Sequence, residues 1–407
     1  VPLLSGGTVL NDGAIIGDNS GIYSQSGIGL TVENHESGVI TGYYGAGIAS
    51  GDNLFLTNDG TINGSGGSID VVATGLRSSD GVTAGYDASI TNNGSITGWS
   101  GNGIYSYDGL NLENSGSITG NGYRNVVGVM PVSYNGYYGS GVSTGDDAVI
   151  VNLAGGSIAG VSSGISAGSN LDLTNYGLIS GSDEGEGYAG VSAYEGANIT
   201  NFGDISGDQF GIVIGESIID SVQALDEVTP SNTITNSGTI TGSEAAISLG
   251  YGENVVNLDF GSTINGDIRG GRASNQLNFL SGSESISEEN NIVHGNVYGM
   301  DVITKSQSGY AFIGGAGESF DVFTDTINIT GGGLVINGRL SSLSEGRTQV
   351  NLIDGGQLDG TGNWNADIAL SSGGLSAGAT TNVLNVPGDA AISLSTAKTL
   401  VDSVTNY

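Results

Sequence analysis

The stretch Asn114 to Gly120, NSGSITG, is one copy of a pattern that returns through most of the chain. Close copies are TNDGTING at 57–64, TNNGSITG at 91–98, TNFGDISG at 200–207 and TNSGTITG at 235–242. The shared pattern, Asn-x-Gly-x-Ile-x-Gly, holds no nucleophile with a neighbouring base, no metal-ligand pair and no phosphate loop. Its recurrence therefore indicates a structural repeat, and repeats have to be identified before other features.

The isoleucine of the pattern measures the length of the repeat. It falls at Ile15, Ile40, Ile62, Ile96, Ile118, Ile158, Ile179, Ile205, Ile240 and Ile264. The shortest steps give a unit of about 22 residues, and the longer steps indicate insertions. Upstream of each Asn an apolar pair alternates with polar residues, as in Leu110 and Leu112, and a third short apolar element such as Gly103-Ile104 precedes it. Period-two alternation predicts strands, so each unit is expected to hold three.

Three short strands per unit leave no room for a crossover helix, so the apolar faces can be buried only by winding into a stacked coil. We therefore predict an all-β fold, a single-stranded right-handed parallel β-helix with corner-loop insertions. The Gly two residues after each Asn is expected to adopt a positive φ at a corner. The Asn side chains are expected to stack as an amide ladder, with a ligand role as the alternative. The predicted ladder is Asn34, Asn58, Asn92, Asn114, Asn175, Asn201 and Asn236.

Charge limits the choice of partners. The 407 residues include 41 acidic and 8 basic residues, a formal charge of −33, and no cysteine. Nucleic acid and anionic membranes are disfavoured because phosphate binding needs clustered Lys and Arg. The sequence also has no apolar run long enough for a membrane-spanning helix, so we predict no membrane insertion by this segment. No cofactor is expected beyond weak binding of a divalent cation such as calcium by scattered carboxylates.

The insertions mark the predicted contact surface. The largest, at 121–139, is rich in tyrosine, and the segment SDEGEGY at 182–188 is acidic. An aromatic surface beside an acidic one suits a glycan or a basic protein, whereas the alternative is that the aromatic side chains pack the loop against the coil. The candidate contact residues are Tyr123, Arg124, Tyr134, Tyr137, Tyr138, Asp183, Glu184, Glu186 and Tyr188. Segment 216–230 has helical apolar spacing and is expected to form a short helix on the side of the coil, with partner docking as the alternative.

Catalytic and metal sites find little support. The two histidines, His35 and His294, lie far apart in sequence, so a Ser-His-Asp site would need local partners for one of them. Acidic doublets such as Asp146-Asp147 and Glu288-Glu289 are the main candidates for polysaccharide cleavage. The segment GGAGES at 314–319 is closest to a calcium-binding repeat, but Ser319 occupies its ligand position. We therefore predict a protein that is not an enzyme and assign no catalytic, cofactor or metal residues.

The closing part of the chain carries a resemblance. Three segments are expected: regular rungs over 1–270, an irregular junction over 271–326, and a C-terminal β-helix over 327–407. The rungs of 11–266, followed by GGQLDGTG at 355–362 and GGLSAG at 373–378, resemble the passenger region of classical type V autotransporters of Gram-negative bacteria. Ala377 stands where that family usually has Pro. The resemblance implies a cell-surface or extracellular location and a C-terminal segment that folds first.

The resemblance is to the adhesin and self-associating type of passenger. It implies adhesion or cell–cell self-association through surface contacts, with a second copy, a host or matrix protein, or a glycan as partner. One alternative is a structural subunit of an extracellular filament or surface layer, because open β-helix ends are exposed strand edges. A polysaccharide-cleaving β-helix enzyme is the other. We also expect Val1 to begin a mature or trimmed polypeptide.

Overall fold

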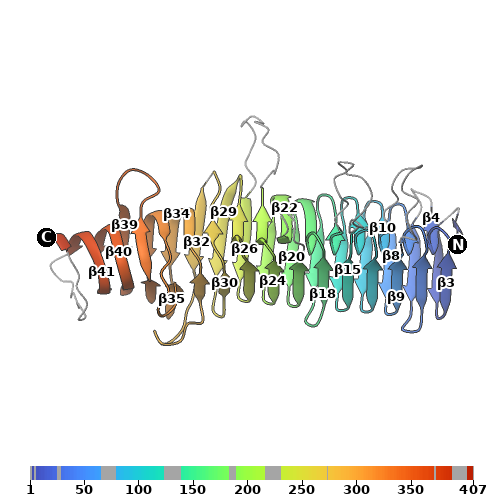
Figure 1. The fold of residues 1–407 in the computed structure, drawn as a ribbon, viewed down its shortest axis with the longest axis horizontal. Coiled ribbons are helices and arrows are strands. Elements are labelled where there is room, and N and C mark those ends of the chain that lie inside the picture. Colours follow the sequence, from blue (N-terminus) through green and yellow to red (C-terminus); the bar gives the residue numbers. More distant parts are fainter. Residues whose placement is uncertain are drawn as a thin grey trace, which may run out of the picture. The chain divides into compact units, whose positions relative to one another are not determined.

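The computed structural model describes residues 2–3, 6–24, 29–65, 79–122, 139–182, 189–215, 231–272, 274–370, 373–386 and 401–406. The chain divides into two compact units, unit 1 (Val1–Ile212) and unit 2 (Val213–Tyr407). Each unit is a parallel β-helix (Figure 1), and the described residues contain strands and turns but no helix. The predicted fold class is therefore confirmed.

Each rung of unit 1 holds three short strands, and each strand pairs in parallel with the strand three places later, as β12 pairs with β15. Three sheets result. Sheet A contains β2 (Gly7–Asn11), β5 (Leu30–Asn34), β8 (Leu54–Asn58), β11 (Ser89–Asn92), β14 (Asn111–Asn114), β17 (Val149–Asn152), β20 (Asp172–Asn175) and β23 (Asn198–Asn201). Sheet B contains β3 (Ala14–Gly17), β6 (Val39–Gly42), β9 (Thr61–Gly64), β12 (Ser95–Gly98), β15 (Ser117–Gly120), β18 (Ser157–Gly160), β21 (Leu178–Gly181) and β24 (Asp204–Gly207). Sheet C contains β1 (Pro2–Leu3), β4 (Ile22–Ser24), β7 (Ile48–Ala49), β10 (Val82–Ala84), β13 (Ile104–Ser106), β16 (Val142–Ser143), β19 (Ile165–Ser169) and β22 (Ala189–Glu195).

Strand β25 (Phe210–Ile214) contains the boundary between the units, and unit 2 then repeats the three-sheet plan with longer strands. Its short strands are β26 (Ser231–Asn236), β27 (Thr239–Gly242), β28 (Ala245–Leu249), β29 (Glu253–Leu258), β30 (Thr263–Asn265), β31 (Ile268–Arg269), β32 (Asn275–Phe279), β33 (Ile292–His294), β35 (Tyr310–Ile313), β37 (Gly333–Ile336), β38 (Gly338–Ser341), β39 (Thr348–Leu352) and β42 (Val401–Asn406). Its long strands are β34 (Val297–Lys305), β36 (Val322–Ile329), β40 (Gly356–Leu370) and β41 (Gly373–Val386). Strand β34 pairs with both β31 and β32, so one strand crosses a corner that in unit 1 separates two strands.

The core of each coil is a set of aliphatic columns. Ile118 pairs in register with Ile96 on one side and Ile158 on the other, and all three side chains are fully buried. The alternation of buried and outward residues along β15 is the pattern expected of a strand with one face in the core. Burying each such side chain stabilises the fold by about 1.5–3 kcal/mol, so the repeat is held together by its apolar positions.

The predicted asparagine ladder is present. Nδ2 of Asn114 donates to Oδ1 of Asn152 at 2.8 Å, and Oδ1 of Asn114 accepts from Nδ2 of Asn92 at 2.8 Å. In unit 1 the ladder comprises Asn11, Asn34, Asn58, Asn92, Asn114, Asn152, Asn175 and Asn201. Asn11 and Asn152 were not among the predicted members. Asn236 lies in unit 2, where its Nδ2 donates to Oγ of Ser262 at 2.7 Å.

The prediction that the glycine two residues after each Asn adopts a positive φ is wrong. Gly116 does not adopt a positive φ; instead, a Cβ added there would lie 2.1 Å from the carbonyl oxygen of Gly94 in the neighbouring rung. The glycine is required because two backbones approach closely at this corner. Left-handed residues occur instead at the corner between sheets C and A, where φ is 58° at Asp87 and 59° at Asp147. Aspartate and asparagine tolerate this conformation better than most residues.

The predicted segment boundaries at 270 and 326 stay predictions. They follow a change of sequence motif, whereas the division between Ile212 and Val213 follows spatial compactness. Within the described ranges, no helix has the length and apolar character needed to cross a membrane.

Candidate binding surface

The nine predicted contact residues lie outside the described residues, in 123–138 and 183–188. The described residues beside these segments do show where the insertions leave the coil. Asn121 N donates to Gly98 O at 2.8 Å, and Ser182 N donates to Gly160 O at 2.9 Å, so both segments start directly after a sheet B strand. Segment 216–230, the predicted helix, also lies outside the described residues and follows a sheet C strand instead. The contact role of these loops stays a prediction.

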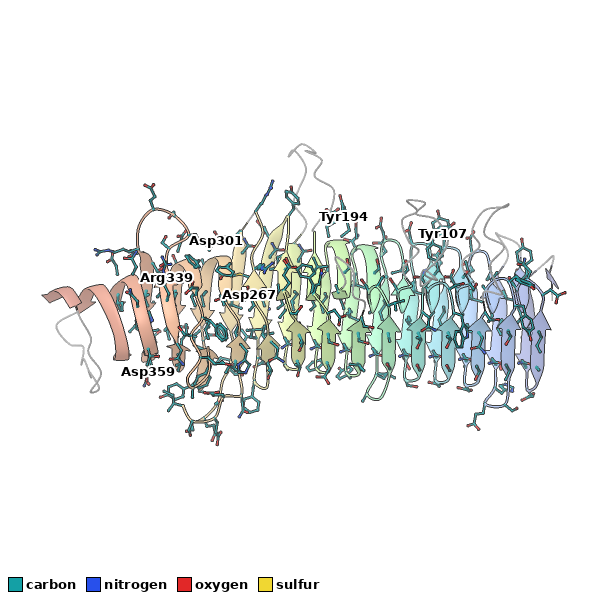
Figure 2. The ribbon with its side chains drawn as sticks, viewed as in Figure 1. Tyr107, Tyr194, Asp267, Asp301, Arg339 and Asp359 are labelled. Carbon is teal, nitrogen blue, oxygen red and sulfur yellow. The ribbon has the colours of Figure 1, made fainter. Side chains whose placement is uncertain are left out.

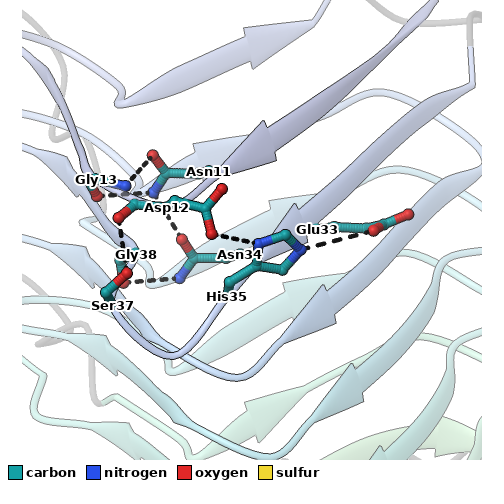
Figure 3. Close-up of polar contacts among 8 residues, drawn as sticks. All are labelled: Asn11, Asp12, Gly13, Glu33, Asn34, His35, Ser37 and Gly38. Carbon is teal, nitrogen blue, oxygen red and sulfur yellow. Dashed lines mark hydrogen bonds and ion pairs between the residues drawn. The ribbon is translucent and has the colours of Figure 1, made fainter.

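His35 has acidic neighbours but no nucleophile aligned with it (Figure 3). Its Nδ1 lies 2.6 Å from Oδ1 of Asp12, and its Nε2 lies 3.8 Å from Oε2 of Glu33. The hydrogen bond to Asp12 and its negative charge raise the pKa of His35. The nearby Ser37 hydroxyl donates to the backbone carbonyl of Asp12 at 2.7 Å. A triad would place a hydroxyl at Nε2, where this histidine faces a second carboxylate.

His294 is part of a loop-fixing network in unit 2. Its Nδ1 lies 2.8 Å from Oε2 of Glu318, which also accepts a hydrogen bond from Gly315 N at 2.7 Å. Partial burial disfavours the charged form of Glu318, but the hydrogen bonds from Gly315 and His294 outweigh it and lower the pKa of this carboxyl. Glu289 accepts a hydrogen bond from Ala316 N at 2.8 Å. The carboxylates around the GGAGES segment therefore hold its backbone.

The corner between sheets C and A of unit 1 gathers carboxylates and tyrosines on successive rungs. We call this surface the acidic corner, and its members are Asp52, Tyr86, Asp87, Tyr107, Asp108, Asp146, Asp147, Tyr194 and Glu195. The doublet Asp146-Asp147, considered above for catalysis, belongs to it. Because the rungs place their side chains at the same corner, the members form a row along the coil, which Ser169 and Asn170 interrupt between Asp147 and Tyr194.

Hydrogen bonds between rungs fix the carboxylates of the acidic corner. Oδ1 of Asp52 accepts from Tyr86 N at 3.1 Å, and Oδ1 of Asp108 accepts from Asp146 N at 3.0 Å. Oδ1 of Asp146 in turn accepts from Ser169 N at 2.7 Å. Each of these carboxylates therefore links its rung to the next through one oxygen, and its position is set by the backbone.

The tyrosines of the acidic corner are ordered yet accessible. Tyr86 and Tyr107 are each 50% exposed and stack with ring centroids 5.3 Å apart. Tyr105, on the outer face of sheet C, meets Tyr107 edge-on at 5.6 Å, and partial burial raises the pKa of its hydroxyl. Tyr194 is 60% exposed, and Tyr107 and Tyr194 project from the strands (Figure 2). Half-exposed aromatic rings held in place lose little entropy on binding.

The sequence carried a signal for this surface. Gly-Tyr-Asp at 85–87 and Tyr-Asp-Gly at 107–109 each directly follow a sheet C strand, and Tyr-Glu-Gly at 194–196 includes the last two residues of one. These short corners belong to the regular rungs, so the insertions, which break the 22-residue spacing, do not point to them.

The described residues contain no group of three His, Cys, Asp or Glu side chains that could hold a metal ion. No family model, no curated protein and no solved structure matches this chain.

Proposed function

We propose that this chain is an extracellular, cell-surface β-helical protein that acts by surface contact, either in adhesion to a host, matrix or glycan target or in self-association between cells. The observation that carries the proposal is the acidic corner, where half-exposed tyrosines lie beside carboxylates that hydrogen bonds between rungs hold in place. Tyrosine is among the residues that contribute most to binding energy, because its ring supplies large contact area and its hydroxyl a hydrogen bond.

The proposed location rests on the resemblance of the repeats and closing segment to type V autotransporter passengers. The β-helix is in keeping with that resemblance, although the fold alone does not define a function. A stack of rungs holds side chains at regular intervals of about 4.8 Å, which suits contact with an extended partner such as a glycan chain.

The experiment compares two stacked aromatic pairs. Tyr86→Ala with Tyr107→Ala removes the pair in the acidic corner, whereas Tyr176→Ala with Phe202→Ala removes an exposed pair with centroids 4.9 Å apart at another corner. Binding of the purified proteins to bacterial cells, animal cells, matrix proteins and a glycan panel is measured. We expect the acidic-corner variant to lose at least tenfold in affinity and the control to bind like the wild type.

Equal binding by wild type and acidic-corner variant would refute the assignment of the surface. Deletion of 121–139 tests the loop prediction in the same assay, since a contact role requires that binding falls. Failure of the wild type to bind any target, itself included, would remove the proposed function as a whole.

A further inference from the structure

The lysine and arginine side chains in the described part of the chain are unevenly distributed between the two units. The Lys and Arg residues among the described residues are Arg269, Arg272, Lys305, Arg339 and Arg347, and all of them belong to unit 2. Arg269 pairs with Glu244 at 2.9 Å, and Arg347 pairs with Asp367 at 3.1 Å. Lys305 is fully buried. In a chain of 41 acidic residues, an arginine without a carboxylate partner is an exception that needs a physical explanation.

Among the described residues, Arg272 and Arg339 both have no carboxylate partner; Arg272 donates from Nη1 to the hydroxyl of Tyr251 at 3.4 Å, whereas an aromatic ring and a serine hold Arg339 in place. Its guanidinium carbon lies 5.4 Å from the centroid of the Phe323 ring, and its Nε donates to Oγ of Ser341 at 3.1 Å. Phe323 stacks in turn on Tyr298, with centroids 5.5 Å apart. Within the described part of the chain, the two Nη groups of Arg339 make no hydrogen bond or ion pair. Because Nε is occupied, the free donors are the parallel pair that binds a planar carboxylate in bidentate fashion.

The residue beside Arg339 on the next rung is neutral and polar. Arg339 pairs in register with Asn363 of β40, and both side chains are exposed. An amide side chain offers both donors and an acceptor, which match the hydroxyl groups of a sugar. Tyr298 and Phe323 are half-buried and add apolar surface on the other side of the guanidinium. The arrangement therefore combines one anion-binding group, one amide and an aromatic surface in unit 2. Arg339 is labelled in Figure 2.

We infer that Arg339, Asn363, Phe323 and Tyr298 form a binding site for a saccharide that carries a single carboxylate, such as a sugar acid at the end of an otherwise neutral glycan. The guanidinium binds the carboxylate, Asn363 binds hydroxyl groups, and the rings contact the apolar C–H face. One free guanidinium matches one negative charge. A polyanion is disfavoured because the −33 formal charge of the chain repels it.

This inference adds a ligand class to the proposed binding function, but it involves different residues from the acidic corner. The probes are D-glucuronic acid, D-glucose as the neutral counterpart, and a polyuronate, titrated into the full chain by calorimetry or NMR. We expect glucuronic acid to bind and glucose to bind at least tenfold more weakly. Arg339→Gln should reduce glucuronic acid affinity at least tenfold, and Asn363→Ala should reduce it by a smaller factor.

The matched control is Arg347→Gln, which removes the same charge from an ion-paired arginine and should leave binding unchanged. Equal affinity of the wild type and Arg339→Gln for glucuronic acid, or equal binding of glucose and glucuronic acid, would overturn the inference. Sedimentation velocity on the same proteins provides a second outcome: if Arg339→Gln abolishes self-association and no saccharide binds, the occupant is a carboxylate of a second copy and the saccharide site is refuted. Retention of cell or matrix binding by Arg339→Gln would leave the proposed function intact.

Discussion

Replacement of Asn114 by alanine should open the coil locally. The side chain is fully buried, donates to Asn152 and accepts from Asn92, so both ladder hydrogen bonds disappear, together with longer contacts from Nδ2 to Gly116 O at 3.2 Å and Ser157 O at 3.4 Å. Each bond contributes about 1 kcal/mol net, and an unsatisfied buried partner costs about 1–3 kcal/mol more. Nδ2 of Asn92 keeps a contact to Gly94 O at 3.3 Å, which places its penalty at the low end. Asn114→Ala is therefore expected to lower the free energy of unfolding by about 2–4 kcal/mol.

Hydrogen exchange followed by mass spectrometry measures this decrease in the local free energy of unfolding for each rung. Amides in β11, β14 and β17 should exchange roughly 30 to 1,000 times faster in Asn114→Ala than in the wild type. The matched control is Asn93→Ala, since Asn93 occupies the same corner but is exposed and donates to Asp59 at 2.8 Å on the surface. Its effect should stay within about 0.5 kcal/mol. Similar exchange in the two variants would refute the structural role of the ladder.

Asn114→Asp adds a signed pH dependence to the same test. The new carboxyl must face the Oδ1 of Asn152, an acceptor, and is removed from water, so its pKa in the folded state should rise above the unfolded value of about 3.9. The folded state then binds more protons, and stability is retained at low pH and lost as pH rises through the folded-state pKa. A stability that does not change between pH 4 and pH 7 would contradict the assigned hydrogen-bond direction.

Four further outcomes are expected. Ile118→Ala should destabilise unit 1 by about 2–5 kcal/mol in urea unfolding while leaving ligand affinity of the folded protein unchanged. Gly116→Ala should destabilise because its Cβ would lie 2.1 Å from a carbonyl oxygen, whereas Gly13→Ala, with nothing within 4 Å, should be close to neutral in thermal unfolding. Burial lowers the pKa of Lys305 from 10.5 to about 8, so the native state binds fewer protons than the unfolded state between these two pH values. The free energy of unfolding should therefore rise with pH in this range. Lys305→Met should remove this rise from unfolding curves measured at different pH values. Self-association, if sedimentation detects it, should strengthen with calcium or moderate salt because these screen the −33 charge, and indifference to chelator and ionic strength would count against this electrostatic account.

The sequence predicted the fold because each rung repeats the same local physics. The spacing of Ile96, Ile118 and Ile158 identified the core column, and the preceding Asn identified the ladder. The conformation of Gly116 was mispredicted because a glycine in a turn usually indicates a positive φ, while here the determining contact comes from a residue one rung away. Such close approaches depend on how rungs stack, which a single repeat does not contain.

The candidate surfaces were harder to predict. In the acidic corner, Tyr86 stacks on Tyr107 of the next rung. This stacking depends on the register in which the two rungs pair, and the positions of the insertions do not reveal that register. The unpaired guanidinium of Arg339 is invisible in sequence, since composition shows only that basic residues are rare. The guanidinium of Arg339 lies over the ring of Phe323 because β36 pairs with β38.

The most direct test of the proposed binding surface is hydroxyl-radical footprinting of the full chain with and without its bound target, whether cells, a glycan or a second copy. We expect Tyr86, Tyr107 and Tyr194 to become protected, while the stacked pair Tyr176 and Phe202, which is similarly exposed, keeps its reactivity. Protection of Tyr176 and Phe202 with no change at the three tyrosines of the acidic corner would contradict this expectation.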